Sequence, residues 1–173
     1  ARRSMGKAAP MARPMADKDQ RPGERQLPFD PGSRIQAGVT FIGHLATPWR
    51  KGDCPKNLTE ARNRGGLFQA VVAPDYRAGL EGLVAGDGII LLYWMAGARR
   101  DLIVQAPAHR PAPRGVFGLR SPARPNPVAL ACVRLLEIDH AAGILTVDAL
   151  DAFDGTPLID IKPWLPGVDN LTR

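Results

Sequence analysis

The sequence predicts a mainly β protein whose strands form a closed or half-closed barrel, with one or two short helices. Three observations favour this fold class. Short apolar stretches recur along the chain, Gly and Pro separate them, and only one segment has helical spacing. The 173 residues include 18 Gly and 17 Pro. Short strands with this density of turn formers are typical of β-barrels.

The expected strands have apolar or partly alternating patterns. They are Ile35–Ala46, Gly66–Ala73, Ile89–Met95, Leu102–Gln105, Gly115–Leu119, Ala129–Ile138 and Ile144–Leu150. The last two flank His140-Ala-Ala-Gly143, which predicts a hairpin turn with glycine at positive φ. Pro74–Val84 has the spacing of a short helix.

Composition indicates a single domain behind an N-terminal arm. With 45% hydrophobic residues, the chain is long enough to bury a core. Residues 35–173 are expected to form one domain. Residues 1–34 read as a basic arm without helical or strand period. Because the chain begins with Ala and has Met at positions 5, 11 and 15, part of the arm is expected to be either an added remnant or an extended native terminus.

The formal net charge of +6 is unevenly distributed. The arm carries eight Lys/Arg and four acidic residues. Residues 99–124 carry six Lys/Arg and one acidic residue. Residues 50–64 carry five Lys/Arg and two acidic residues, whereas residues 134–173 carry three Lys/Arg and seven acidic residues. This split is compatible with a polyanionic partner at one face.

Several classes of protein are not expected. The sequence has no run of 18 apolar residues and no secretory signal at its start. Two cysteines, Cys54 and Cys132, cannot form a disulfide framework or a four-ligand metal site, so a reduced cytoplasmic setting and no metal are expected. Walker, dinucleotide-binding, zinc-protease and nucleophile-elbow motifs are missing.

Two segments combine polar side chains with rigid or turn-forming residues. Gly115–Pro127 (GVFGLRSPARPNP) presents two guanidiniums from a proline-stiffened loop, which suits a carboxylate or phosphate. Asp151–Pro163 (DAFDGTPLIDIKP) contains a turn followed by Asp160 and Lys162, which share a face if the segment is extended. Solvated arginines in the first segment and an ordinary ion pair in the second remain alternatives, as does pairing of Arg120 with Asp154.

Both segments resemble the signature motifs of the TsaA/YaeB-like (TrmO) family of tRNA methyltransferases. The resemblance rests on RSPARPNP at 120–127 and DGTPLIDIKPWLP at 154–166. Weaker similarity is found at Phe41–His44, Thr47–Trp49, Cys54–Asn57 and Leu80–Leu83, and the whole covers about residues 38–169. It implies a compact closed barrel that differs from Rossmann methyltransferases and binds S-adenosylmethionine, usually as a homodimer. The implied activity is N6-methylation of threonylcarbamoyladenosine at tRNA position 37, in the anticodon loop.

The resemblance also suggests roles for individual residues. For the cofactor, we expect Arg120 or Arg124 at the methionine carboxylate and Asp154 or Asp160 at its amino group or ribose. The backbone around Ser121 and Gly155–Thr156 would hydrogen-bond to the edge of the adenine. Apolar residues of Val128–Leu130, namely Val128 and Leu130, would cover the adenine face. Asp160 is the expected proton acceptor, and Asn126 and Asn57 would orient the acceptor. Besides the arm, the expected RNA contacts are Arg50, Lys51, Lys56, Asn57, Arg62 and Arg64.

The sequence departs from the family pattern at several positions. The central strand region lacks a histidine, Asn57 stands where a glutamine is usual, and Trp164 replaces a tyrosine. Three alternatives therefore stay open. They are a barrel that binds the cofactor or a nucleotide together with tRNA without methyl transfer, a methyltransferase with a different acceptor, and a structural barrel with the same fold.

Overall fold

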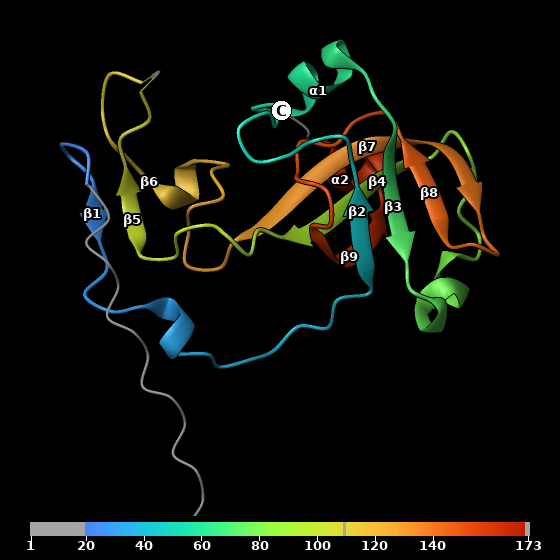
Figure 1. Cartoon of the computed structure of the whole chain (residues 1–173), viewed down its shortest axis with the longest axis horizontal. Coiled ribbons are helices and arrows are strands. Elements are labelled where there is room, and N and C mark those ends of the chain that lie inside the picture. The colour runs from blue at the N-terminus through green and yellow to red at the C-terminus, as the bar shows by residue number, and fades with distance from the viewer. Residues whose placement is uncertain (1–19, 109, 172–173) are drawn as a thin grey trace, which may run out of the picture.

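The computed structural model of the chain describes residues 20–108 and 110–171, and within them it is mainly β, as predicted. Two sheets lie side by side: a six-stranded barrel and a small three-stranded sheet (Figure 1). The barrel strands are β2 (Gly43–Ala46), β3 (Phe68–Val72), β4 (Gly88–Trp94), β7 (Val128–Asp139), β8 (Ile144–Val147) and β9 (Pro157–Pro163). The small sheet contains β1 (Arg25–Gln26), β5 (Leu102–Gln105) and β6 (Arg114–Gly115).

The barrel closes because every strand pairs with two neighbours, in the order β2-β3-β8-β7-β4-β9 and back to β2. All of these pairs are antiparallel. The final contact, between β9 and β2, is short and involves Gly43 opposite Leu158 and His44 opposite Pro157. A register shift in the β4–β9 pair, between Leu92 and Tyr93, bulges β9 at Ile159.

The inside of the barrel is filled by alternate side chains of its strands. In β4, Ile89, Leu91 and Tyr93 are buried, while the residues between them are more exposed. Phe68, Ala70 and Val72 of β3 face the same core. Because a small barrel packed in this way has no room for a ligand inside, a binding site is expected on its outside or beside it.

Part of the N-terminal arm belongs to the folded body. Arg25 pairs with Val104 and Gln26 with Leu102, so β1 forms one edge of the small sheet. A single 3-10 turn follows at Pro31–Ser33, capped by the Asp30 side chain. The prediction that residues 1–34 lack regular structure is therefore wrong for these positions, and residues 1–19 lie outside the described part. An exposed linker then crosses from the small sheet to β2 (Figure 1).

Several predicted boundaries also need correction. Of Ile35–Ala46, only the last four residues are a strand, and Gly115–Leu119 is mostly a 3-10 turn, Val116–Gly118. The predicted helix at 74–84 is a 3-10 helix, Pro74–Leu80. The α-helices α1 (Leu58–Arg64) and α2 (Pro166–Asp169) were not identified as individual elements.

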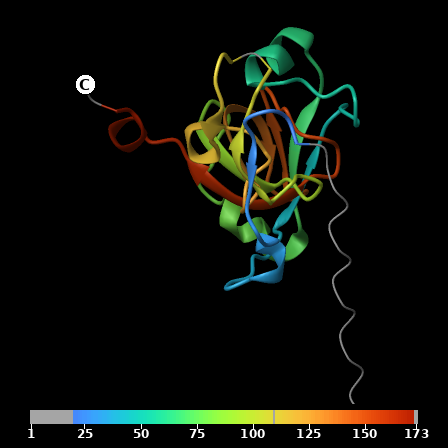
Figure 2. The ribbon, with the colours of Figure 1, turned by 90° about the vertical axis from the view of Figure 1, so that its left-hand side faces the viewer.

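The C-terminal segment that carries α2 extends away from the barrel (Figure 2). Both α-helices are short, and a search of the described residues finds no helix with the length and apolarity needed to cross a membrane.

Candidate functional site

A cavity of about 1020 Å³ lies beside the barrel, between the small sheet and the loop that leads into β7. Its walls come from the end of the arm, the segment before α1, the β5 region and residues 117–122. The first polar motif contributes Arg120 and Ser121. Cationic side chains dominate the lining, namely Arg21, Lys56, Arg99, Arg110 and Arg120, against the single carboxylate of Glu24. An anionic group is therefore the favoured ligand of this cavity.

The loop between Arg120 and Pro127 is held from both sides. Arg124 donates hydrogen bonds to the carbonyl oxygens of Leu119 (3.1 Å) and Ser121 (3.3 Å), so its guanidinium braces its own loop. Arg100 donates to the carbonyl oxygen of Pro125 (2.6 Å) and contacts Asn126 Oδ1 at 3.4 Å. The loop thus reaches the cavity in a fixed conformation at Arg120 and Ser121. This limits the entropy lost when a ligand binds.

The second motif turns back onto β2 and the segment that follows it. Asp154 Oδ1 accepts from Thr47 N (3.1 Å), and Oδ2 pairs with Arg50 at 2.6 Å. Gly155 N donates to the Leu45 carbonyl, Thr156 N donates to Phe153, and the Thr156 carbonyl accepts from Leu45 N. Asp154 therefore pairs with Arg50 rather than Arg120. The backbone N–H groups of Gly155 and Thr156 are engaged within the fold, and the expected role of this backbone at an adenine edge stays a prediction.

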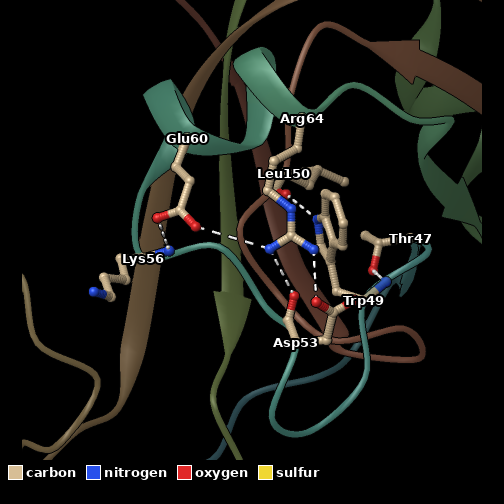
Figure 3. Close-up of polar contacts among 7 residues, drawn as sticks. All are labelled: Thr47, Trp49, Asp53, Lys56, Glu60, Arg64 and Leu150. Atoms are coloured by element: carbon tan, nitrogen blue, oxygen red, sulfur yellow. Dashed lines mark hydrogen bonds and ion pairs between the residues drawn. The ribbon is translucent and has the colours of Figure 1, made fainter.

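An arginine and a tryptophan fix the segment between β2 and α1 (Figure 3). The Arg64 guanidinium lies 4.4 Å from the Trp49 ring centroid and donates to Asp53 Oδ1 (2.7 Å) and to the Asp53 carbonyl (2.9 Å). It also lies 3.8 Å from a carboxylate oxygen of Glu60. Trp49 itself is buried and donates from Nε1 to the Leu150 carbonyl at 2.7 Å. Arg64 is thus a structural anchor of this segment.

The other expected RNA contacts divide into engaged and exposed residues. Asn57 caps α1 by accepting from Glu60 N at 2.9 Å through Oδ1, and its expected role in orienting the acceptor stays a prediction. Arg62 pairs with Asp148 at 2.7 Å. Lys51 and Lys56 are exposed, and within the described residues neither forms an ion pair. Of this predicted group, only Lys56 reaches the cavity.

A third group of predicted residues shares the outer face of the barrel. Leu92 of β4 lies opposite Leu130 on one side and Asp160 on the other, and Trp94 lies opposite Val128. Two strand spacings place Asp160 about 10 Å from Leu130. Asp160 is paired with Lys162 at 2.8 Å. Asn126 precedes β7 by two residues, so the first motif links the cavity to this outer face.

A buried polar cluster lies inside one end of the barrel. The Tyr93 hydroxyl donates to Asp151 Oδ1 at 2.9 Å. Burial, followed by the charge of Asp151, raises the pKa of Tyr93 well above its usual range. The same two causes raise the pKa of the Cys54 thiol to about 11, so the thiol stays protonated at neutral pH. This agrees with the expectation of an unreactive Cys54.

Sequence reasoning missed most of the cationic wall. Arg99 and Arg110 line the cavity but were not singled out, and Arg21 was included only through the general expectation that the arm contacts RNA. The charge excess of residues 99–124 was a readable signal for two of them. The position of Arg21 depends on the pairing of β1 with β5, and no local sequence pattern indicates that pairing.

A filled barrel with a basic cavity at its side defines a class of β-barrel protein whose candidate ligand site lies outside the barrel. The family model described as the tRNA-methyltransferase O N-terminal domain matches residues 44–170, so the chain belongs to this family. The resemblance found in the sequence is confirmed.

Named relatives agree with this assignment. A probable S-adenosyl-L-methionine-binding protein of Methanothermobacter thermautotrophicus is 44% identical over 140 residues, which cover 80% of this chain and 98% of that protein. A protein of the same description from Archaeoglobus fulgidus is 39% identical, but the match spans only 34% of its length. The tRNA (adenine(37)-N6)-methyltransferase of Escherichia coli is 30% identical, with 75% of this chain and 58% of that enzyme covered.

The fold is also similar to a crystal structure of TrmO from Pseudomonas aeruginosa. The TM-score is 0.60 at 27% sequence identity, and the match covers 79% of this chain and 60% of the other. The chain thus spans about three fifths of the two methyltransferases that it matches over most of its own length.

We expect Arg64→Ala to lower the free energy of unfolding by about 1–2 kcal/mol, because it removes a cation–π contact and the bonds to Asp53. Arg64→Lys should also destabilise, since an ammonium cannot reproduce the planar stack with two parallel donors. Urea unfolding measures both. Asn63→Ala, an exposed change on the same helix, is the control. Equal stability of all three variants and the parent would show that Arg64 anchors nothing.

We expect Asp154 to contribute stability above its unfolded pKa, near 4, and to lose that contribution as the pH falls. The hydrogen bond from Arg50, followed by that from the backbone of Thr47, lowers the pKa of Asp154 in the folded state. In urea titrations, Asp154→Asn should therefore be less stable than the parent at pH 7. The difference should shrink below about pH 4. A difference that is independent of pH contradicts the assignment.

Proposed function

We propose that the protein is an S-adenosylmethionine-dependent tRNA methyltransferase that methylates N6 of threonylcarbamoyladenosine at position 37, in the anticodon loop. The single observation that carries this proposal is the convergence of the family match with the cavity: the family's first motif places Arg120 and Ser121 in a basic cavity outside a filled barrel. The names of the relatives supply the cofactor and the reaction class.

The residues at the cavity suit the cofactor. Arg120 offers a guanidinium for the methionine carboxylate, Ser121 offers a hydroxyl, and Leu119 adds apolar surface. Arg124 is the weaker candidate for the carboxylate, because it already braces its own loop. When bound, S-adenosylmethionine supplies an activated methyl group, so the protein has to align the acceptor and remove a proton.

The outer face carries the remaining proposed roles. Asp160 is our candidate to accept the proton of the acceptor nitrogen, and a modest base suffices because a carbamoylated N6 is more acidic than an amine. Val128 and Leu130 offer apolar surface to the adenine, and Asn126, which joins cavity and face, would orient the acceptor. Asp154, paired with Arg50, is left with a structural role.

A homodimer is part of the same proposal. Beyond the two residues proposed for the adenine, β7 exposes Leu136, and the linker before β2 exposes Ile35 and Val39. Exposed apolar side chains of this kind suit a subunit contact. A reduced, cytoplasmic setting is part of the proposal as well.

The alternative with a specific observation behind it is a barrel that binds the cofactor and tRNA without methyl transfer. Asp160 Oδ2 is paired with Lys162 Nζ at 2.8 Å, so this carboxylate oxygen already has a partner where an acceptor proton would have to be received. A methyltransferase with another acceptor is distinguished from both by its product.

The decisive assay incubates the purified chain with methyl-labelled S-adenosylmethionine and tRNA that contains threonylcarbamoyladenosine. Nucleoside mass spectrometry should then find the label on that nucleoside alone, and Asp160→Asn should lower the rate at least tenfold. Cofactor binding by calorimetry without any product would favour the binding protein. Label on a different nucleoside would identify another acceptor, and no cofactor binding at all would contradict the whole proposal.

A further inference from the structure

We propose that the wall of the cavity beside the small sheet β1-β5-β6 is an RNA-binding subsite, in which Arg21, Lys56 and Arg110 hold a phosphate and Phe117 stacks on a neighbouring base. The RNA as partner rests on the proposed function. The subsite itself rests on charge, exposure and position within the described residues.

The cations of this cavity come from separate parts of the chain. Arg21 precedes β1, Lys56 precedes α1, and Arg110 lies between β5 and β6. Bringing like charges to one wall raises the free energy of the folded protein unless an anion is bound there. Their gathering therefore points to a ligand with negative charge rather than to a role in folding.

These charges are not neutralised by the protein. Within residues 20–108 and 110–171, none of Arg21, Lys56 and Arg110 forms an ion pair. Arg21 donates one long hydrogen bond, 3.4 Å, to the Ala106 carbonyl, which leaves its positive charge without a carboxylate partner. Figure 3 shows the Lys56 side chain pointing away from the Arg64 contacts, while only its backbone N–H donates to Glu60. By contrast, the cavity residue Arg99 is bound through two nitrogens to buried Asp101, which removes it from the set available to a ligand.

The one carboxylate in the cavity wall has a structural partner on each side. Glu24 accepts from the backbone N–H of Arg21 at 3.1 Å and from that of Ala106 at 3.3 Å. It ties the arm to the end of β5, next to the β1–β5 pairing. The cavity thus keeps a net positive wall, and the carboxylate that is present holds the arm in place.

An aromatic side chain lies at the same wall. Phe117 lines the cavity and is nevertheless 81% exposed, whereas the neighbouring Val116 is buried. An exposed aromatic ring beside cations that have no carboxylate partner among the described residues is an arrangement by which proteins bind single-stranded nucleic acid, with the phosphate on the cations and a base on the ring. A free inorganic anion has no surface that could stack on the Phe117 ring, so the ring favours a nucleic acid over such an anion.

The subsite also lies beside the proposed cofactor residues. Arg120 and Ser121 belong to the same cavity and follow Phe117 by three and four residues. RNA held by Arg110 and Phe117 would therefore arrive next to the methyl donor. The small sheet is separate from the barrel, and its role would be to hold the segments that carry Arg21 and Arg110 at the cavity.

The test compares variants of the full chain with a labelled RNA hairpin that has the sequence of an anticodon arm. We expect Arg110→Ala to weaken RNA binding about tenfold. It should also lower the slope of log affinity against log salt by about 0.7, the value for one lost contact to a single strand. Phe117→Leu should weaken binding about tenfold as well, and Phe117→Tyr should restore it. Arg114→Ala removes an equal charge from β6, outside the cavity, and is the matched control.

Calorimetry with S-adenosylmethionine separates this subsite from the cofactor site. Arg110→Ala should leave cofactor affinity unchanged, and Arg120→Ala should weaken it. The subsite is disproved if the parent chain does not bind the hairpin, or if Arg110→Ala and Arg114→Ala bind it equally well. RNA binding that depends on Arg110 and Phe117 in a chain that transfers no methyl group would support the subsite and overturn only the proposed reaction.

Discussion

The structure depends on one constraint: the barrel must close between β2 and β9, and only two residues of each strand pair there. The adjoining segments provide the remaining contacts. Thr47 donates from its hydroxyl to the Ala152 carbonyl, Trp49 donates to the Leu150 carbonyl, and Asp154 N donates to the Trp49 carbonyl. The DGTP turn is therefore the clasp of the barrel. Its polar residues are explained by ring closure before any ligand is considered.

This clasp also positions the surroundings of the cavity. Arg64 stacks on Trp49, which the clasp holds, and binds Asp53, so the segment that ends at Lys56 is fixed relative to the barrel. On the other side, Arg100 and Arg124 fix the loop that carries Arg120. A rigid barrel with a filled interior thus presents two held segments to one outside cavity, which is how a scaffold without an internal pocket can bind ligands.

The sequence was informative wherever the structure depends on local pattern. Leu102–Gln105 was located with its correct ends, and β4 and β7 within one residue, because short apolar stretches bounded by turns identify strands well. Helix α1 was missed although Asn57 and Glu60 form a readable cap, since a helix of seven residues has little periodicity. The roles of Arg50 and Arg62 were not predictable. Their partners, Asp154 and Asp148, lie 104 and 86 residues away, so these pairs exist only once the barrel has closed.

The central claim is that the cofactor binds in the side cavity at Arg120 and Ser121, outside the filled barrel. A crystal structure of the chain grown with S-adenosylmethionine tests it most directly. We expect the methionine carboxylate within hydrogen-bond distance of the Arg120 guanidinium, with the barrel interior unchanged. Cofactor bound at the DGTP turn or inside the barrel, with the side cavity empty, would contradict it.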